Sequence, residues 1–197
     1  MKVLEIISSL DPTGGAETFA VNFSIEMQHI SDLKVVVLYR KHKDYFEEKL
    51  KENNVDYIFL NKAKRFDLKN VKELRQIIKE YKPDVIHTEN NALIPTFLAL
   101  RMLKKAQRPN VFHTMHLKAE DETSSKIVRI LFKHIFKKPN FIPVAITKSL
   151  AIESQNFYKV NYVPYVENGV SLEPFRTDKP LISRTYDVVV VGRFAPQ

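Results

Sequence analysis

The sequence predicts an α/β fold, a Rossmann-like doubly wound parallel sheet flanked by helices. Short runs rich in β-branched and other apolar residues alternate along the chain with longer segments whose apolar residues recur at helical spacing. Because strands that alternate with helices build right-handed βαβ units, the strands are expected to be parallel and covered on both faces. The chain has 197 residues, of which 44% are hydrophobic, so it can bury the core that such a sheet needs.

Six apolar runs have the length and composition of strands. The second of them reads Leu-Lys-Val-Val-Val-Leu-Tyr, and the first is interrupted by Glu5. Strands in the middle of a parallel sheet are apolar on both faces, which is the pattern that these runs show. In chain order the predicted strands are Lys2–Ser9, Leu33–Tyr39, Asp56–Leu60, Asp84–Thr88, Asn110–Met115 and Phe141–Ile146, with a short extended segment at Tyr162–Tyr165.

The segments between these strands have helical periodicity. Phe19, Phe23 and Met27 are four residues apart in the first of them, so they share one face of a helix. A similar apolar stripe that includes Val71 and Leu74 runs along the third. The predicted helices are Ala16–His29, Asp44–Asn54, Leu68–Tyr81, Asn91–Lys105, Ser124–Lys138 and Lys148–Tyr158.

The C-terminal part of the chain predicts a domain boundary. Residues 1–165 are expected to form the Rossmann-like domain, and the aperiodic residues 166–185, with two prolines, a linker. Residues 186–197 contain an apolar run followed by Gly192, like the first strand of a second Rossmann unit. Such a strand needs helices on both faces, so the chain is expected to be a fragment. The alternative is an additional edge strand in the first sheet.

The charge of the chain is concentrated in one block. Of a formal net charge of +8, residues 101–148 supply all, with eleven Lys or Arg against three Asp or Glu. Within this block Lys126–Lys138 reads as a basic amphipathic helix, which can lie on an anionic membrane surface. Packing of its apolar face on the sheet, with solvated charges, is the alternative. A nucleic-acid partner is not expected, because the block lacks the interleaved aromatic and basic residues of a known nucleic-acid-binding module.

Several classes of protein are excluded or disfavoured by composition. The chain has no cysteine, so it has neither a disulfide framework nor a thiolate nucleophile or ligand. No apolar run approaches the roughly 18–20 residues that cross a bilayer. The N-terminal apolar run is short and contains Glu5, unlike a secretory signal, so a cytoplasmic location is expected. Attachment at the inner face of the cell membrane is compatible with the basic helix.

Ligands of doubly wound sheets bind beyond the carboxyl ends of the strands, so the residues that follow each strand are the candidates. Gly14 and Gly15 follow the first strand and let the backbone approach a ligand at the start of a helix, where free N–H groups favour an anion. They match neither the dinucleotide fingerprint nor the Walker loop. A polar run, His87-Thr88-Glu89-Asn90-Asn91, stands at the end of the fourth strand, at the expected ligand edge.

The fifth predicted strand ends in a pair of histidines. Strand alternation puts His113 and Met115 on one face, and Thr114 and His116 on the other. His116 lies at the end of the strand, where an imidazole can donate a hydrogen bond or accept a proton. A metal site made of His113, His116 and His87 is an alternative, but the spacing fixes no ligand geometry and no metal is expected.

Five motifs together resemble one family. They are Gly14–Glu17, Pro83–Thr88, Thr114–His116, Asn168–Val170 and Val191–Phe194. In this order and spacing they resemble the N-terminal domain of the retaining glycosyltransferases of family 4, and the resemblance covers essentially the whole chain. It implies a GT-B architecture, in which two Rossmann-like domains face a cleft and the N-terminal one binds the acceptor.

The resemblance also implies roles for individual residues. His116 would contact the transferred sugar, and Arg193 would stabilise the departing diphosphate in place of a metal ion. The other donor- or acceptor-binding positions would be Gly14, Gly15, Glu17, Thr88, Glu89, Asn90, Thr114, Asn168 and Gly169. No cofactor is expected. The implied substrates are a UDP- or GDP-sugar and a saccharide or lipid-linked acceptor, as in polysaccharide biosynthesis.

The family's lysine after the Gly-Arg motif, its paired glutamates and its nucleotide-binding helices would lie beyond Gln197. The chain by itself is therefore expected to fold without catalysing. A non-catalytic module that binds a glycan or an anionic ligand is the alternative. A nucleotide-dependent oxidoreductase is disfavoured, because the second strand does not end in an acidic residue.

Overall fold

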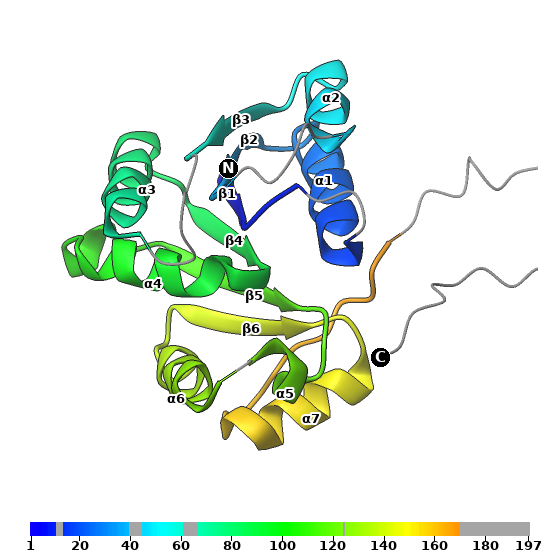
Figure 1. Ribbon diagram of the computed structural model, residues 1–197, viewed down its shortest axis with the longest axis vertical. Helices are drawn as coiled ribbons and strands as arrows, with labels where there is room; N and C mark the ends of the chain where they lie inside the picture. The colour runs from blue at the N-terminus through cyan, green and yellow to red at the C-terminus, as the bar shows by residue number, and fades with distance from the viewer. Residues whose placement is uncertain (11–13, 40–44, 61–66, 124, 170–197) are drawn as a thin grey trace, which may run out of the picture.

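The computed structural model describes residues 1–10, 14–39, 45–60, 67–123 and 125–169. A six-stranded parallel sheet in the order β3-β2-β1-β4-β5-β6 runs through them (Figure 1). The strands are β1 (Lys2–Ile7), β2 (Asp32–Val37), β3 (Asp56–Phe59), β4 (Val85–Glu89), β5 (Asn110–Met115) and β6 (Phe141–Ala145). The order reverses between β1 and β4, which confirms the doubly wound Rossmann-like topology.

Helices cover both faces of this sheet (Figure 1). The α-helices are α1 (Gly15–Met27), α2 (Tyr45–Glu52), α3 (Leu68–Tyr81), α4 (Leu93–Arg101), α5 (Ala119–Glu122), α6 (Lys126–Ile135) and α7 (Lys148–Tyr158). Two short 3₁₀ helices, η1 (Asn90–Ala92) and η2 (Lys105–Gln107), flank α4. None of the helices in the described residues is long and apolar enough to cross a membrane.

Two apolar clusters, one on each face of the sheet, make the core. Val3, Ile7 and their neighbours on β2 pack against α1 and α2. Leu4 and Ile6 point to the opposite face and join the larger cluster beneath α3, α4 and α6. Since successive residues of β1 alternate between these clusters, Glu5 lies on the α1 face, among apolar neighbours.

The predicted helix Asn91–Lys105 is wrong at both ends. Asn90 adopts a left-handed conformation with φ of 51°, so the chain leaves β4 through a tight turn and η1 before α4 begins. The helix then ends at Arg101. The Arg108 side chain donates hydrogen bonds to the carbonyl groups of Arg101 and Leu103 at 3.3 Å and 2.8 Å. The Arg108 guanidinium thus satisfies carbonyl groups at and after the end of the helix. Helical periodicity in the sequence does not indicate such a contact.

The predicted helix Ser124–Lys138 is shorter than expected and is preceded by the unpredicted α5. Ser125 caps α6 by accepting a hydrogen bond from the backbone N–H of Val128. Phe132 and Ile135 are buried against the core, which confirms that part of the apolar face packs inward. Ile127 and Ile130 face solvent instead.

Of the predicted extended segment Tyr162–Tyr165, the structure confirms strand-like pairing at its last residue. Tyr165 forms an isolated parallel bridge with Ala145 at the end of β6. Residues 166–169 have no regular secondary structure and are exposed. The rest of the predicted linker and the predicted strand within residues 186–197 lie outside the described residues.

Candidate active site at the carboxyl edge of the sheet

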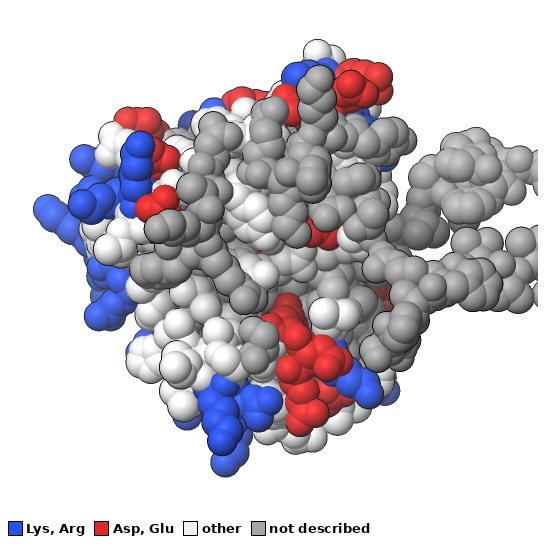
Figure 2. Space-filling view, in the orientation of Figure 1, with Lys and Arg blue, Asp and Glu red and all other residues white. Residues whose placement is uncertain are grey.

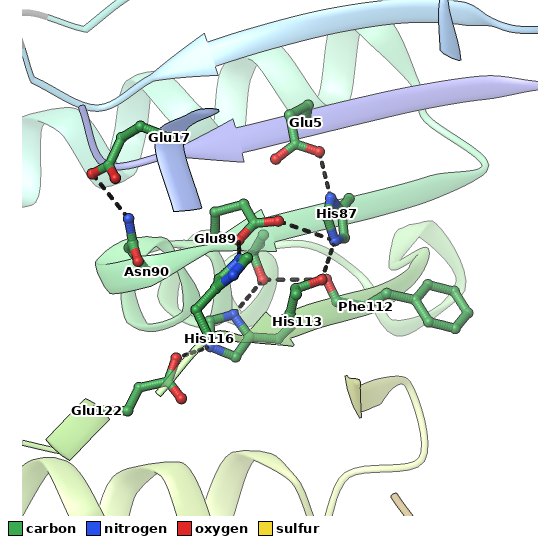
Figure 3. A network of polar contacts seen from close by, with 11 residues as sticks. Glu5, Glu17, His87, Glu89, Asn90, Phe112, His113, His116 and Glu122 are labelled. Atoms are coloured by element: carbon green, nitrogen blue, oxygen red, sulfur yellow. Dashed lines mark hydrogen bonds and ion pairs between the residues drawn. The ribbon is translucent and has the colours of Figure 1, made fainter. Parts of the chain in front are cut away.

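Five polar side chains from three adjacent strands meet on the α1 face of the sheet, and Figure 3 labels four of them, Glu5, His87, Glu89 and His116. They are Glu5 of β1, His87 and Glu89 of β4, Thr114 at the end of β5, and His116 just after it. The parallel register pairs Glu5 with His87 and Glu89 with Thr114, so their side chains lie next to one another on the same face. The predicted facing of Thr114 and His116 is confirmed. We call these five residues the polar cluster.

The centre of the polar cluster is a buried ion pair. The His87 Nδ1 atom lies 2.5 Å from Glu5 Oε2, and Glu5 is fully buried. The other ring nitrogen, Nε2, lies 2.7 Å from Thr114 Oγ1 and 3.5 Å from Glu89 Oε1. Both nitrogens of His87 are therefore engaged, so the ring is held by Glu5 of β1 on one side and by Thr114 of β5 on the other.

Glu89 links this pair to His116. Its Oε2 atom lies 2.5 Å from His116 Nε2, while its Oε1 atom has no hydrogen-bond partner among the described residues. Glu89 is fully buried, and the His116 side chain is only 10% exposed, at the rim. The chain of contacts thus runs from Glu5 deep in the sheet to an imidazole at its carboxyl edge.

Two phenylalanines of α1 close the polar cluster from above. Phe23 lies 4.9 Å from the His87 ring and Phe19 lies 5.5 Å from the His116 ring, measured between centroids. Phe19 and Phe23 also stack on each other, as their spacing of four along a helix allows. This apolar cover lowers the local dielectric, so interactions between the charges beneath it are stronger than in water.

Burial and neighbouring charges shift three pKa values in the polar cluster. Burial lowers the pKa of His87, but the carboxylate of Glu5 outweighs it and raises that pKa to about 9. Burial holds the pKa of Glu89 well above its ordinary value, with the charge of His87 acting against this and that of Glu5 adding to it. The pKa of His116 is lowered, chiefly by burial.

We expect the stability of the protein to fall as the pH rises from 6.5 to 9. Across this window folded His87 keeps a proton that the unfolded chain releases, because its pKa rises from 6.5 to about 9 on folding. Stability from this group is complete below pH 6.5 and lost as the pH passes 9. The raised pKa of Glu89 acts in the same direction. Urea unfolding at pH 6, 7.5 and 9 should show a loss on the order of 2–3 kcal/mol.

The control for this pH dependence is a protein in which Glu5 and His87 are both replaced by leucine. That variant should lose most of the slope between pH 6.5 and 9, although Glu89 still titrates in it. A wild-type free energy of unfolding that stays constant across the window would contradict the buried ion pair.

A second polar corner lies where α1 begins. Asn90 Nδ2 donates a hydrogen bond to Glu17 Oε1 at 3.1 Å, joining the end of β4 to the first turn of α1. The Glu17 carboxyl lies directly over Gly14, in the space that a Cβ atom at Gly14 would occupy, whereas a Cβ at Gly15 would meet nothing. Gly14 is thus required by a close approach and Gly15 is not. The same carboxylate stands at the positive end of α1.

We expect Gly14→Ala to displace the Glu17 carboxyl and to weaken its hydrogen bond with Asn90. The loss should lower the free energy of unfolding by about 1 kcal/mol, since one hydrogen bond and a tolerated N-cap residue are lost. Gly15→Ala is the matched control, because the added methyl group meets open space and Ala favours the helix. Urea unfolding of both variants measures the difference. Equal stabilities of the two would show that Glu17 moves aside without cost.

The opposite face carries a separate set of polar contacts. Thr88 Oγ1 lies 2.9 Å from His113 Nδ1, and the His113 ring packs edge-to-face against Phe132 of α6 and lies tilted beside Phe136, which caps that helix. Its Nε2 atom lies 3.4 Å from Glu122 Oε1. The side chain of Thr88, a predicted site residue, therefore faces away from the polar cluster. His113 does so too, so the three histidines of the alternative metal site do not converge.

The ligand atoms of Glu5, His87 and Glu89 do lie within 4.8 Å of one another. To hold a cation, a ring nitrogen of His87 would have to give up its contact with either Glu5 or Thr114. The remaining predicted residues lie elsewhere or are not described. Asn168 and Gly169 are exposed after the Tyr165 bridge, and Arg193 lies outside the described residues. Sequence reasoning missed Glu5 as a member of the site, whereas His87 belongs to the predicted polar run at the end of the fourth strand.

Comparison with known proteins decides the family. The model of Glycosyltransferase Family 4 matches residues 13–174, which is most of the chain. The chain belongs to glycosyltransferase family 4. No curated protein matches the sequence significantly.

Solved structures of glycosyltransferases share the fold of this family 4 chain. HepE from Anabaena, in complex with UDP and glucose, superposes with a TM-score of 0.70 at 16% identity, over 90% of this chain and 47% of HepE. A glycosyltransferase from Rickettsia africae has a TM-score of 0.65 at 16% identity, over 88% of this chain and 44% of that protein.

The lipopolysaccharide outer core galactosyltransferase WaaB, in its apo form, has a TM-score of 0.62 at 16% identity, over 87% of this chain and 47% of WaaB. The chain thus spans about half the length of these structures. The likeness confirms the predicted fold, one Rossmann-like half of a GT-B glycosyltransferase.

Proposed function

We propose that this family 4 chain supplies the acceptor-side half of a retaining glycosyltransferase, which moves a hexose from a nucleotide-sugar to a saccharide or lipid-linked acceptor. The observation that supports the proposal is the polar cluster, with His116 at its rim. A buried chain of polar contacts that ends in an imidazole at the rim can orient a group toward a ligand. It lies at the carboxyl edge of the sheet beside the reversal of strand order, where open α/β sheets bind ligands.

The corner formed by Asn90 and Glu17 suits the hydroxyl groups of a sugar. An amide and a carboxylate offer both donors and acceptors, which a sugar hydroxyl can match. A phosphate group would meet the negative charge of Glu17 at Gly14, so we place the acceptor saccharide there. The open backbone at Gly15 is left for the donor phosphate.

The donor in our proposal is a UDP- or GDP-sugar. HepE was crystallised with UDP, with UDP and glucose, and with UDP-glucose, which favours a uridine nucleotide first. The leaving diphosphate would be stabilised by Arg193, whose guanidinium can bind two phosphate oxygens, without a metal ion or other cofactor. Both assignments are proposals for the whole protein rather than for the described residues.

The experiment is an assay of sugar transfer by the protein extended through a second domain, using UDP-glucose, UDP-N-acetylglucosamine and GDP-mannose in the presence of EDTA. Turnover with EDTA, and a product whose anomeric configuration by NMR equals that of the donor, would support the proposal. Inversion of the anomeric configuration would overturn the proposed retaining mechanism. Full inhibition by EDTA would overturn the proposal that transfer needs no metal ion. Glycan or nucleotide binding without turnover would favour the non-catalytic binding module.

We further propose that α6 places the protein on an anionic membrane at the cytoplasmic face. Ile127 and Ile130 are 78% and 68% exposed and stand beside Lys126 and Lys133. Lys and Arg gather over α6 and the outer ends of α3 and α4, while acidic side chains gather over α5 (Figure 2). Exposed apolar residues flanked by lysines are typical of interfacial helices, and each lysine contributes about 1 kcal/mol near anionic lipid.

A basic cavity near the C-terminal ends of α4 and α6 adds to this surface. Its volume is about 430 Å³, and Phe97 and Phe141 contribute apolar wall. The cationic side chains around it are Arg101, Lys105, Arg108 and Lys138. A phosphate headgroup with the first part of an acyl chain matches this combination of charge and apolar surface.

We expect the double variant Ile127→Asp, Ile130→Asp to bind vesicles that contain phosphatidylglycerol at least about tenfold more weakly. Two apolar side chains that could insert between the lipids are lost, and two negative charges are added. Ile30→Asp is the control, since Ile30 is also 78% exposed but lies in the turn after α1, far from α6 in the sequence. Vesicle sedimentation measures the difference. Equal binding of all three proteins would show that α6 does not contact lipid.

A further inference from the structure

The buried polar cluster contains more ionisable groups than a single ion pair needs. Glu5 and His87 neutralise each other at 2.5 Å. Glu89 adds a second carboxyl beneath the same apolar cover, 3.5 Å from His87 Nε2 and 2.5 Å from His116 Nε2. Burying a net charge in such a place is costly, so the cheapest arrangement of protons keeps Glu89 and His116 neutral as a pair.

Two arrangements of the hydrogen bond between Glu89 and an uncharged His116 ring differ in their consequences, and only the first leaves the pair without a net charge. If Glu89 carries the proton, its O–H donates to His116 Nε2, and the ring proton of His116 sits on Nδ1. If Glu89 is a carboxylate, it accepts a hydrogen bond from the Nε2–H group of His116, and Nδ1 is a bare acceptor. The second arrangement leaves an anion inside the sheet, where its Oε1 atom forms no hydrogen bond within the described residues and has only the longer 3.5 Å contact with His87 Nε2.

We propose that Glu89 is a positioning residue that keeps its proton, donates it in a hydrogen bond to His116 Nε2, and so fixes His116 in the Nδ1–H tautomer. Within the described residues no hydrogen bond involves His116 Nδ1, so this N–H is the group that the ring offers to a ligand. The inference rests on the proposed function in one respect: the ligand would be a sugar, whose hydroxyl or ring oxygen accepts from Nδ1–H. In proteins generally, the hydrogen bond made by one ring nitrogen of a histidine decides whether the other ring nitrogen carries the proton.

The electrostatic surroundings favour this assignment. Glu5, Glu17 and Glu122 all lie near enough to Glu89 to disfavour a further negative charge, and the charge of His87 acts against them. Burial and, to a smaller extent, the charge of His87 disfavour the imidazolium form of His116, against the opposing effect of nearby carboxylates such as Glu122. The pKa of Glu89 is raised and that of His116 is lowered, which is the combination that a neutral pair requires.

The test reads the tautomer directly and needs no substrate. We would label the histidines of the chain with ¹⁵N and record long-range ¹H–¹⁵N spectra between pH 6 and 8. The expected result is a protonated Nδ1 and an unprotonated Nε2 for His116, assigned by its loss in His116→Gln. The exposed His134, whose ring nitrogens form no hydrogen bond within the described residues, serves as the reference. A protonated Nε2, or protons on both nitrogens, would overturn the proposal.

Two variants of Glu89 separate positioning from mere packing. Glu89→Gln retains an N–H donor and should keep His116 in the Nδ1–H tautomer, whereas Glu89→Leu should release the ring to the mixture shown by His134. The infrared spectrum of the wild type should contain a buried carboxylic acid C=O band that Glu89→Gln lacks. Absence of that band would overturn the proposal even if Glu89→Leu failed to fold.

Activity gives a separate readout. In the transfer assay Glu89→Gln should stay within about threefold of wild-type kcat, and Glu89→Leu should lose kcat more than it raises KM. A protein that shows the expected tautomer but transfers no sugar would contradict the proposed function and leave the assignment of Glu89 standing. A protein that transfers sugar with His116 in the Nε2–H tautomer would do the reverse.

Discussion

Replacing Glu5 with leucine is expected to lower the free energy of unfolding at pH 7 by about 3–5 kcal/mol. The reason is the partner it leaves behind. His87 lies beneath Phe19 and Phe23, and its proton is held there by the Glu5 carboxylate at 2.5 Å. Without Glu5, His87 must either keep an unpaired buried charge or give up its proton and its hydrogen bond. Urea unfolding followed by circular dichroism measures the loss.

A double-mutant cycle shows whether the loss comes from the ion pair or from packing. His87→Leu alone should also be costly, because it leaves the Glu5 carboxylate buried without its cation. The double variant with leucine at both positions should recover much of the stability, since apolar residues often replace a buried ion pair at little cost. Additive losses in the double variant would show that the two residues act independently.

The pH gives a second control on the same variant. Above pH 9 the wild type also loses the charge on His87, so the difference between wild type and Glu5→Leu should shrink. A difference that stays constant between pH 7 and 10 would assign the loss to the cavity or to strain instead. In that case Glu5→Gln, which keeps the size of the side chain, would be close to wild type at every pH.

Glu5 also shows where prediction from sequence stops. In the sequence, Glu5 appears only as a break in the first apolar run. Its alternation with Val3 and Ile7 nevertheless implies the face of the sheet on which it lies. What no pattern contains is the strand order, which puts β4 next to β1 and brings His87 beside Glu5 in register. Parallel neighbours are distant in sequence, so a pair separated by 82 residues carries no local signal.

Thr114 and His116 were predictable because both depend on one strand. Their shared face follows from alternation, and the end of β5 lies where the apolar run predicts. Thr88 was chosen for its position at a strand end, and the same alternation assigns its side chain to the other face, toward His113. A strand residue therefore joins the site only if it lies near the carboxyl end of its strand and its side chain points to the α1 face of the sheet. The left-handed turn at Asn90 needed the structure, because it depends on how η1 packs.

Replacing His116 with alanine is expected to reduce sugar transfer by about 10²–10³-fold, the loss typical for a donor that acts on the reacting centre. The His116 ring is the member of the polar cluster that reaches the rim, so its removal takes away the contact with substrate while Glu5 and His87 stay paired. Steady-state kinetics on the protein extended through a second domain, with circular dichroism to check folding, measures the effect. His29→Ala, an exposed histidine after α1, is the matched control and should leave kcat unchanged.

The outcome of His116→Ala also depends on how kcat and KM divide. A lower kcat with an unchanged KM would mean that the imidazole acts in the transition state, whereas a higher KM alone would mean that it only binds the sugar. Unchanged turnover would remove His116 from the site. Because Glu89 is proposed to act through His116, adding Glu89→Leu to His116→Ala should slow the reaction no further. An additional loss in the double variant would mean that Glu89 contacts the substrate on its own, because residues that act through a single group do not add.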